Sequence, residues 1–265
     1  MAALDQIRLK LNRADRHVQE LEAALLAFKK NNPYKVGTKV DEHTQCLVYY
    51  ITQAEEVPAA ISLIAGDVLQ NLRTALDHLA WQLVPTGGRN SQTAFPISDD
   101  VIKYSSDKVR KMSGMSEAAV DAIDATKPFK GGNDAIWRLH RLNNIDKHRL
   151  LVTVGASFRS VNVSTHIVGQ MLKAGIAMHL GLKPGRTVHI PNLHLRPKDN
   201  LFPLKVGSEL FMDLPGAEVN PRMNFLIDVA FGEPNVCEGE PVLDALKNMA
   251  SVVGGIVSDF ASLLS

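Results

Sequence analysis

Two stretches of the sequence carry an arginine followed at helical spacing by a histidine. Arg73 precedes His78 with four residues between them, and Arg141 precedes His148 with six between them. Histidine titrates near neutral pH and can move a proton, while the guanidinium fork of arginine can hold a phosphate as charge builds on it. Such a pair could cleave RNA without a metal ion, because it supplies both the proton transfer and the fixed cation.

The first of these stretches, residues 66–83, predicts an amphipathic helix. Its leucines share one half of the helical wheel, whereas Asn71, Asp77 and His78 lie on the other half, with Arg73 at its edge. At about 100° per residue, Arg73 and His78 stand about 140° apart around the helix axis. They can therefore act on one substrate only if it spans the helix edge or a second helix completes the site.

The second stretch, residues 133–150, also predicts a helix. Asn143 and Asp146 fall inside its apolar arc, so both side chains need polar partners in the core. His140, Asn144 and His148 follow at steps of four residues on another face. The basic residues of this helix are opposed only by Asp146, which predicts a local basic patch formed by Arg138, Arg141, Lys147 and Arg149.

Both stretches fit the pattern Arg-x(4–6)-His, and at this point the chain resembles the HEPN superfamily (higher eukaryotes and prokaryotes nucleotide-binding). This is a family of helical bundles whose members include metal-independent ribonucleases. Thr74 follows Arg73 where active relatives usually carry Asn, Asp or His. The strings NLRTALDHLAWQL and LHRLNNIDKHRLL are also similar to uncharacterised bacterial proteins, which implies no activity.

The resemblance implies a metal-independent endoribonuclease in which Arg73 and His78 are catalytic. It implies no cofactor, RNA or a nucleotide as the partner, and a homodimer in which a second copy supplies the second helix; Arg141 and His148 could also supply it within one chain. The residues expected to bind the substrate or support the site are Asn71, Asp77, Arg141, Asn143, Asn144, Asp146, Lys147 and His148.

Two other functions fit the same residues. Asn143 and Asp146 could pair with Arg73 or Asn71 across the core, so that the polar rows are structural. The chain would then be a non-catalytic binding protein for a ligand or nucleotide, with its sheet facing the ligand. Trp81 and Trp137 could line such a pocket, although packing in the core explains both indoles.

A metal centre in the bundle is the third alternative. It would draw on residues of both polar helices, namely Asp77, His78, Asp146 and His148. Neither helix contains the Glu-x-x-His pair of bundle metalloenzymes, and His189 and His194 do not share a regular strand face. We therefore expect no metal.

Composition excludes several protein classes. The chain has 265 residues, 45% of them hydrophobic, so it can bury a core. Its 29 Lys and Arg nearly balance its 28 Asp and Glu, so its net charge would not attract nucleic acid or an anionic membrane. Cys46 and Cys237 form no disulfide framework. With no apolar signal core and no apolar run of about 18 residues, we expect a cytoplasmic protein without membrane association.

The spacing of apolar residues predicts an α+β fold. Seams with alternating steps of three and four indicate long helices over 4–28 and 242–263, which we expect to pack together. With the two polar helices they make a four-helix bundle. Short helices are expected over 101–112 and 116–125, and Phe95–Ile97 is expected to be a packed loop anchor.

Alternating β-branched and aromatic residues predict the strands. A short β-hairpin is expected over 34–40 and 46–52, and an antiparallel sheet of about five strands within 151–232. The clearest strand patterns in the sheet are 157–167, 186–195, 208–214 and 222–231. We therefore expect one domain over 1–265, in which the helical bundle, 1–150 and 233–265, carries the sheet as an insertion.

Overall fold

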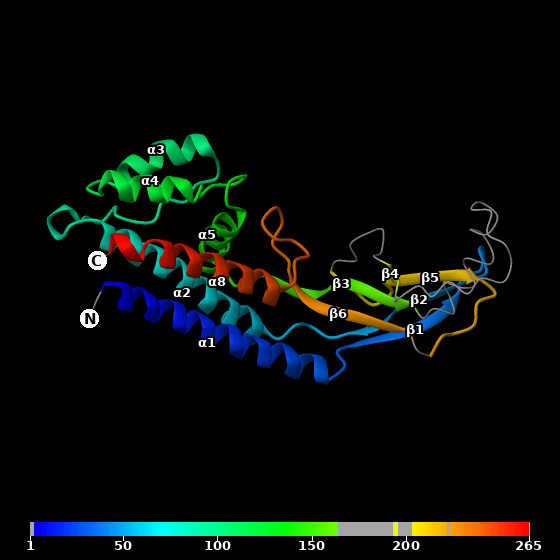
Figure 1. Ribbon diagram of the computed structural model, residues 1–265. Helices are drawn as coiled ribbons and strands as arrows, with labels where there is room; N and C mark the ends of the chain where they lie inside the picture. The colour runs from blue at the N-terminus through cyan, green and yellow to red at the C-terminus, as the bar shows by residue number, and fades with distance from the viewer. Residues whose placement is uncertain (1–2, 164–192, 196–202, 222, 265) are drawn as a thin grey trace, which may run out of the picture. The chain divides into compact units, whose positions relative to one another are not determined.

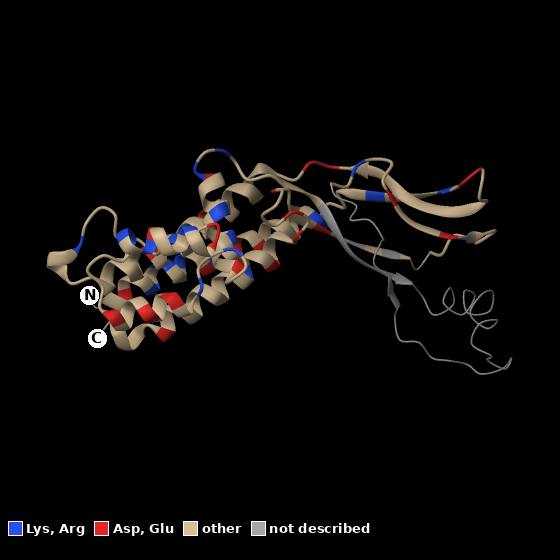
Figure 2. Ribbon diagram, turned by 90° about the horizontal axis from the view of Figure 1, so that it is seen from above, with Lys and Arg blue, Asp and Glu red and all other residues tan. Residues whose placement is uncertain are grey.

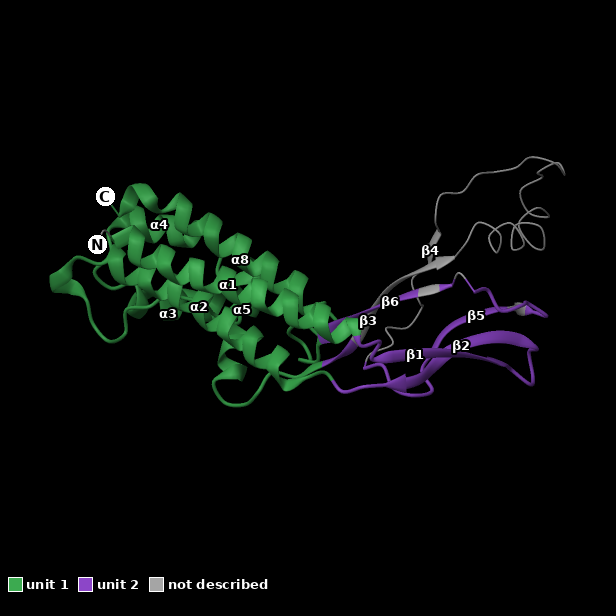
Figure 3. Cartoon of the chain, turned by 90° about the horizontal axis from the view of Figure 1, so that it is seen from below, with its two compact units in different colours: residues 1–30, 57–153, 231–265 green, residues 31–56, 154–230 purple. Residues whose placement is uncertain are grey.

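The computed structural model describes residues 3–163, 193–195, 203–221 and 223–264, and its fold is α+β (Figure 1). The chain divides into two compact units (Figure 3). Unit 1 is helical and consists of residues 1–30, 57–153 and 231–265. Unit 2 contains the strands and consists of residues 31–56 and 154–230. The expected hairpin thus belongs to the same unit as the rest of the strands.

Unit 1 is built on four long helices, α1 (Ala3–Lys30), α2 (Ala59–Leu83), α5 (Asp134–Asp146) and α8 (Val242–Asp259). Helix α2 contacts each of the other three, and α8 also contacts α1 and α5. The expected contact between the first and last long helices is therefore present. The predicted seam of α1 is buried, through Ile7, Ala14, Val18, Leu21, Leu25 and Phe28.

The segment between α2 and α5 folds over these helices. It contains a short 3₁₀ turn, Thr86–Gly88, and two helices at the expected places, α3 (Val101–Lys111) and α4 (Glu117–Ala125). Asp100 and Ser116 cap the two helices with their side chains. Phe95 and Ile97 are almost fully buried, which confirms that this loop is packed.

The described residues of unit 2 form two three-stranded sheets in place of the single sheet expected within 151–232. In the first, β1 (Tyr34–Val40) pairs antiparallel with β2 (Cys46–Ala54), and β2 pairs antiparallel with β5 (Glu209–Pro215). In the second, β3 (Thr153–Val163) lies between β4 (Leu193–Leu195) and β6 (Asn224–Phe231). The hairpin was predicted correctly, but β2 also joins a strand more than 150 residues later in the sequence.

Parts of the predicted sheet lie outside the described residues. These are the end of the expected strand 157–167, most of the expected strand 186–195, and His189. Among the helices that are described, none is long and apolar enough to cross a membrane.

The turn before α5 allows a test of how tightly the helix start is held. The carbonyl of Lys127 accepts a hydrogen bond from the Asn133 amide, and a Cβ on Gly132 would lie 2.5 Å from that carbonyl oxygen. We expect Gly132→Ala to lower the free energy of unfolding by about 1–3 kcal/mol, because backbone atoms must move. Thermal and urea unfolding measure this effect.

Gly255 provides the matched control. It lies exposed within α8, and a Cβ there would have no atom within 4 Å. Gly255→Ala should stabilise the protein by up to about 1 kcal/mol, since alanine is the better helix former. Equal effects of the two substitutions would contradict the packing described for the turn.

Candidate functional site

Arg73 lies in the interior of unit 1, not on an accessible polar face. Only 7% of the residue is exposed. Its Nη2 donates to Asp77 Oδ1 at 2.7 Å and to the Phe95 carbonyl at 2.9 Å, and the same Asp77 oxygen accepts the Phe95 amide at 3.1 Å. Burial lowers the pKa of Arg73, and the Asp77 carboxylate opposes that shift. Arg73 and Asp77 therefore attach α2 to the loop at Phe95.

His78 lies elsewhere on α2. Its side chain is half-buried, and no hydrogen bond joins it to another described residue. Asn71 is also half-buried, and it donates to the carbonyl of Asp67 in its own helix at 2.8 Å. Within the described structure, no hydrogen bond or ion pair connects Arg73 with His78. Because Arg73 is buried and His78 is partly exposed, no accessible face of α2 presents both side chains.

The polar residues of α5 separate into buried and exposed groups. Asn143 is 1% exposed, as its place in the apolar arc predicts, but it does not pair with Arg73 or Asn71. Asp146 is half-buried against Gly66 of α2, where a Cβ would lie 2.5 Å from the carboxylate. Burial and the nearby charge of Asp67 raise the pKa of Asp146. These contacts join α5 to α2 without the pairs that the sequence suggested.

The expected basic patch on α5 is weaker than the sequence count indicates. Arg141, Lys147 and His148 are exposed, and Arg141 Nη1 lies 3.8 Å from Asp99 Oδ1. The other two cations of the patch form ion pairs with acids from later in the chain, Arg138 with Glu240 and Arg149 with Glu233, each at 2.7 Å. Figure 2 shows acidic and basic residues interspersed along the helical unit.

His140 is a residue that our selection from the sequence missed. Its Nε2 lies 3.1 Å from Asn144 Nδ2, one helical turn away. Burial, followed by the charges of Arg73 and Lys111, lowers the pKa of His140 to about 3. The imidazole is therefore neutral at physiological pH. The row of His140, Asn144 and His148 at steps of four residues was the available signal.

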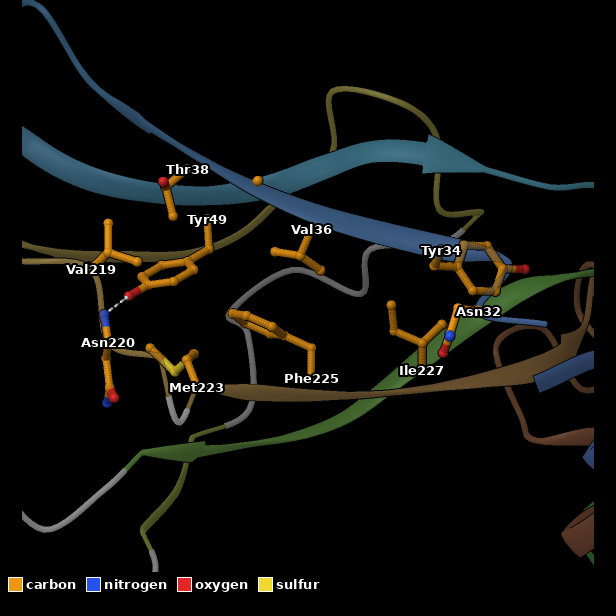
Figure 4. Close-up of a pocket in the computed structure, with 11 residues that line it drawn as sticks. Asn32, Tyr34, Val36, Thr38, Tyr49, Val219, Asn220, Met223, Phe225 and Ile227 are labelled. Atoms are coloured by element: carbon orange, nitrogen blue, oxygen red, sulfur yellow. Dashed lines mark hydrogen bonds between the residues drawn. The ribbon is translucent and has the colours of Figure 1, made fainter. Parts of the chain in front are cut away.

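Unit 2 contains a cavity of about 430 Å³ beside β1, β2 and β6 (Figure 4). Aromatic and aliphatic side chains line it, but polar atoms make up more of its exposed wall than apolar atoms do. Tyr49 Oη accepts a hydrogen bond from the Asn220 backbone amide at 2.9 Å. The lining residues are Asn32, Tyr34, Val36, Gly37, Thr38, Tyr49, Val219, Asn220, Met223, Phe225 and Ile227. None of these residues is charged, which distinguishes the cavity from the polar rows of unit 1.

The two tryptophans do not line this cavity. Trp81 is 39% exposed, and the guanidinium of Arg89 lies over its ring, 5.5 Å from the centroid. Trp137 is buried, and its Nε1 donates to Asp99 Oδ1 at 3.2 Å. The expected packing in the core is thus confirmed for Trp137 and wrong for Trp81, whose exposed ring lies beneath Arg89.

Comparison with protein-family models, with curated proteins and with solved structures found no match to this chain. In the described part of the chain, no group of three His, Cys, Asp or Glu side chains is arranged to hold a metal ion. Cys237 is buried, and burial raises the pKa of its thiol to about 12.

Arg73 and His78 can be distinguished by their effect on stability. Arg73→Ala removes a buried cation that bonds to Asp77 and Phe95, so we expect the free energy of unfolding to fall by about 3 kcal/mol. His78→Ala removes a half-exposed ring without such bonds, and its effect should stay below about 1 kcal/mol.

Urea unfolding followed by circular dichroism measures both changes. Arg73→Lys is an informative third variant, because it keeps the charge but replaces the planar guanidinium, whose Nη2 bonds to both Asp77 and Phe95. A stability of Arg73→Ala equal to that of the wild type would contradict the role of Arg73 in attaching the loop to α2.

Proposed function

We propose that this chain is a binding protein that receives a small, uncharged molecule with both apolar and polar groups in the cavity of unit 2. The observation that carries the proposal is the cavity itself, with its volume of about 430 Å³ and its aromatic wall (Figure 4). Ligand sites in proteins usually measure about 300–1,000 Å³ and combine apolar walls with a few polar groups. The polar rows of α2 and α5 are, in this proposal, structural.

The chemistry of the wall defines the class of ligand. No Lys, Arg, Asp or Glu lines the cavity, so a phosphate or a carboxylate would lose its hydration without gaining a counter-charge. Tyr49 and Phe225 provide ring faces, while Val36 and Ile227 provide aliphatic surface. An uncharged molecule that carries a ring or a short aliphatic group is thus favoured over a nucleotide.

Three polar side chains set the position of hydrogen-bonding groups on the ligand. Asn32 and Asn220 contribute amides, and Thr38 contributes a hydroxyl. The Asn220 backbone amide is already bonded to Tyr49, which helps to hold this part of the wall in place. Amide side chains both donate and accept hydrogen bonds, so the expected ligand carries one or two neutral polar groups.

Filling the cavity tests the proposal. The neutral, apolar dye Nile red should bind the wild-type protein with a rise in fluorescence. Val36→Trp should weaken that binding about tenfold or more, because the indole occupies the space that Val36 lines. Fluorescence titration gives the dissociation constant, and circular dichroism shows that the variant is folded.

Val40→Trp is the matched control. Val40 lies on the same strand, four residues from Val36, but it is 57% exposed and does not line the cavity. Its affinity for the dye should equal that of the wild type. If both variants bind like the wild type, or if the wild type does not bind, the cavity is not a ligand site.

We propose a HEPN-like endoribonuclease as the second candidate function, with α1, α2, α5 and α8 as its four-helix bundle. The half-exposed ring of His78, which has no hydrogen bond to another described residue, supports this function because its nitrogens are available for proton transfer. Arg73 Nη1, likewise without a partner in that part of the chain, is the proposed phosphate donor. A second copy of the chain completes the site.

This second function is tested on a mixed RNA pool in the presence of a chelator. The wild type should cleave RNA and leave 2′,3′-cyclic phosphate ends, and His78→Ala and Arg73→Ala should each lower the rate about 100-fold or more. The assay temperature is chosen below the melting point of both variants. RNA that stays intact with the wild type over a range of pH and salt would exclude this activity.

A further inference from the structure

Five polar atoms on two contacting helices of unit 1 are buried without a hydrogen-bond partner among the described residues. Four of them are Arg73 Nη1 on α2, and His140 Nδ1, Asn143 Nδ2 and Asn143 Oδ1 on α5; the fifth, Arg138 Nε on α5, belongs to a guanidinium that already pairs with Glu240. Most buried polar groups in proteins have a partner, and each one left without costs about 1–3 kcal/mol. Because several such atoms occur on the two contacting helices α2 and α5, we infer that a bound molecule or ion forms hydrogen bonds with them.

Hydrogen bonding identifies three of the four atoms as donors. The Nδ2 of Asn144 can only donate, so Nε2 of the neutral His140 accepts, and the ring proton is on Nδ1. Nη1 of Arg73 and Nδ2 of Asn143 are donors by their chemistry. The set therefore needs an acceptor more than it needs another donor.

The charges around His140 also favour an acceptor with a negative charge. Arg73, Lys111 and Lys147 each act on the imidazole as positive charges, and Asp99 is the acid that opposes them. Lys111 is itself half-buried, and burial lowers its pKa although Asp107 and Asp77 act in the other direction. Asp77 already accepts two hydrogen bonds through one oxygen, from Arg73 and Phe95.

We propose that a small monovalent anion, with chloride as the representative, binds between α2 and α5 and accepts hydrogen bonds from Arg73 Nη1, His140 Nδ1 and Asn143 Nδ2. A single small ion is favoured because all three donors are shielded from solvent. The ion adds a bridge between the helices beside the contact of Arg73 with Asp77. This site lies in unit 1 and is independent of ligand binding in unit 2.

Bromide, which replaces chloride and scatters X-rays anomalously, is the probe. Crystals of the full chain grown in sodium bromide should show an anomalous peak within hydrogen-bond distance of Arg73, His140 and Asn143. In solution, the thermal midpoint should rise by several degrees from sodium gluconate to sodium bromide at equal ionic strength, and the rise should saturate, because the ion binds the folded state.

Asn143→Leu removes one donor and the buried acceptor. The rise of its thermal midpoint should therefore need at least about tenfold more bromide than that of the wild type. Gln70→Leu makes the same kind of change at an exposed position of α2 and should keep the wild-type dependence. His140→Leu is the second variant if Asn143→Leu does not fold. Equal wild-type midpoints in both salts, or ordered water without an anomalous peak at these atoms, would overturn the proposal.

Discussion

The burial of one positive charge, that of Arg73, constrains the helical unit more than any other contact. A guanidinium in the interior is tolerated only if hydrogen bonds and a counter-charge compensate for its lost hydration. Asp77 supplies the charge from the next turn of α2, and the backbone of Phe95 supplies both a carbonyl to Arg73 and an amide to Asp77. The loop that precedes α3 is thereby fixed to the central helix, which contacts α1, α5 and α8.

A second buried charge holds the end of α5 in a similar way. Glu233 is 1% exposed and accepts from Arg149 through both oxygens and from the Val152 amide at 2.8 Å. In both cases a charge is bonded to a side chain and to the backbone of a distant segment. Removing one partner leaves the other uncompensated, so each pair fixes how loop and helix meet even where its net contribution to stability is small.

Local periodicity made the helices predictable. The seams of α1 and α8 place apolar residues at steps of three and four, and a helix must bury such a seam whatever its partner is. The hairpin of β1 and β2 was equally local. The pairing of Cys46 in β2 with Pro215 in β5 was not, since nothing in either segment specifies a partner so far away in the sequence.

The candidate site was less predictable for the same reason. Arg73 stands at the edge of the polar half of α2, and the helical wheel does not decide on which side of that edge the side chain lies. Its burial depends on Phe95, 22 residues later, whose backbone groups complete its hydrogen bonds. The residue types of the unit 2 cavity gave no signal, because Val36 and Phe225 are ordinary strand residues until β1 and β6 come together.

The energy of the Arg73 contacts bears directly on what the residue can do. Breaking an ion pair in which Arg73 is buried and Asp77 is partly exposed costs about 3 kcal/mol, and a conformation in which Arg73 leaves Asp77 to meet a substrate would be rarer by the corresponding factor of about 10². The binding energy of a substrate would have to supply that amount before any of it accelerated a reaction. An arginine held in this way is therefore best suited to work in place, through Nη1, the terminal nitrogen that its bonds to Asp77 and Phe95 leave uncommitted.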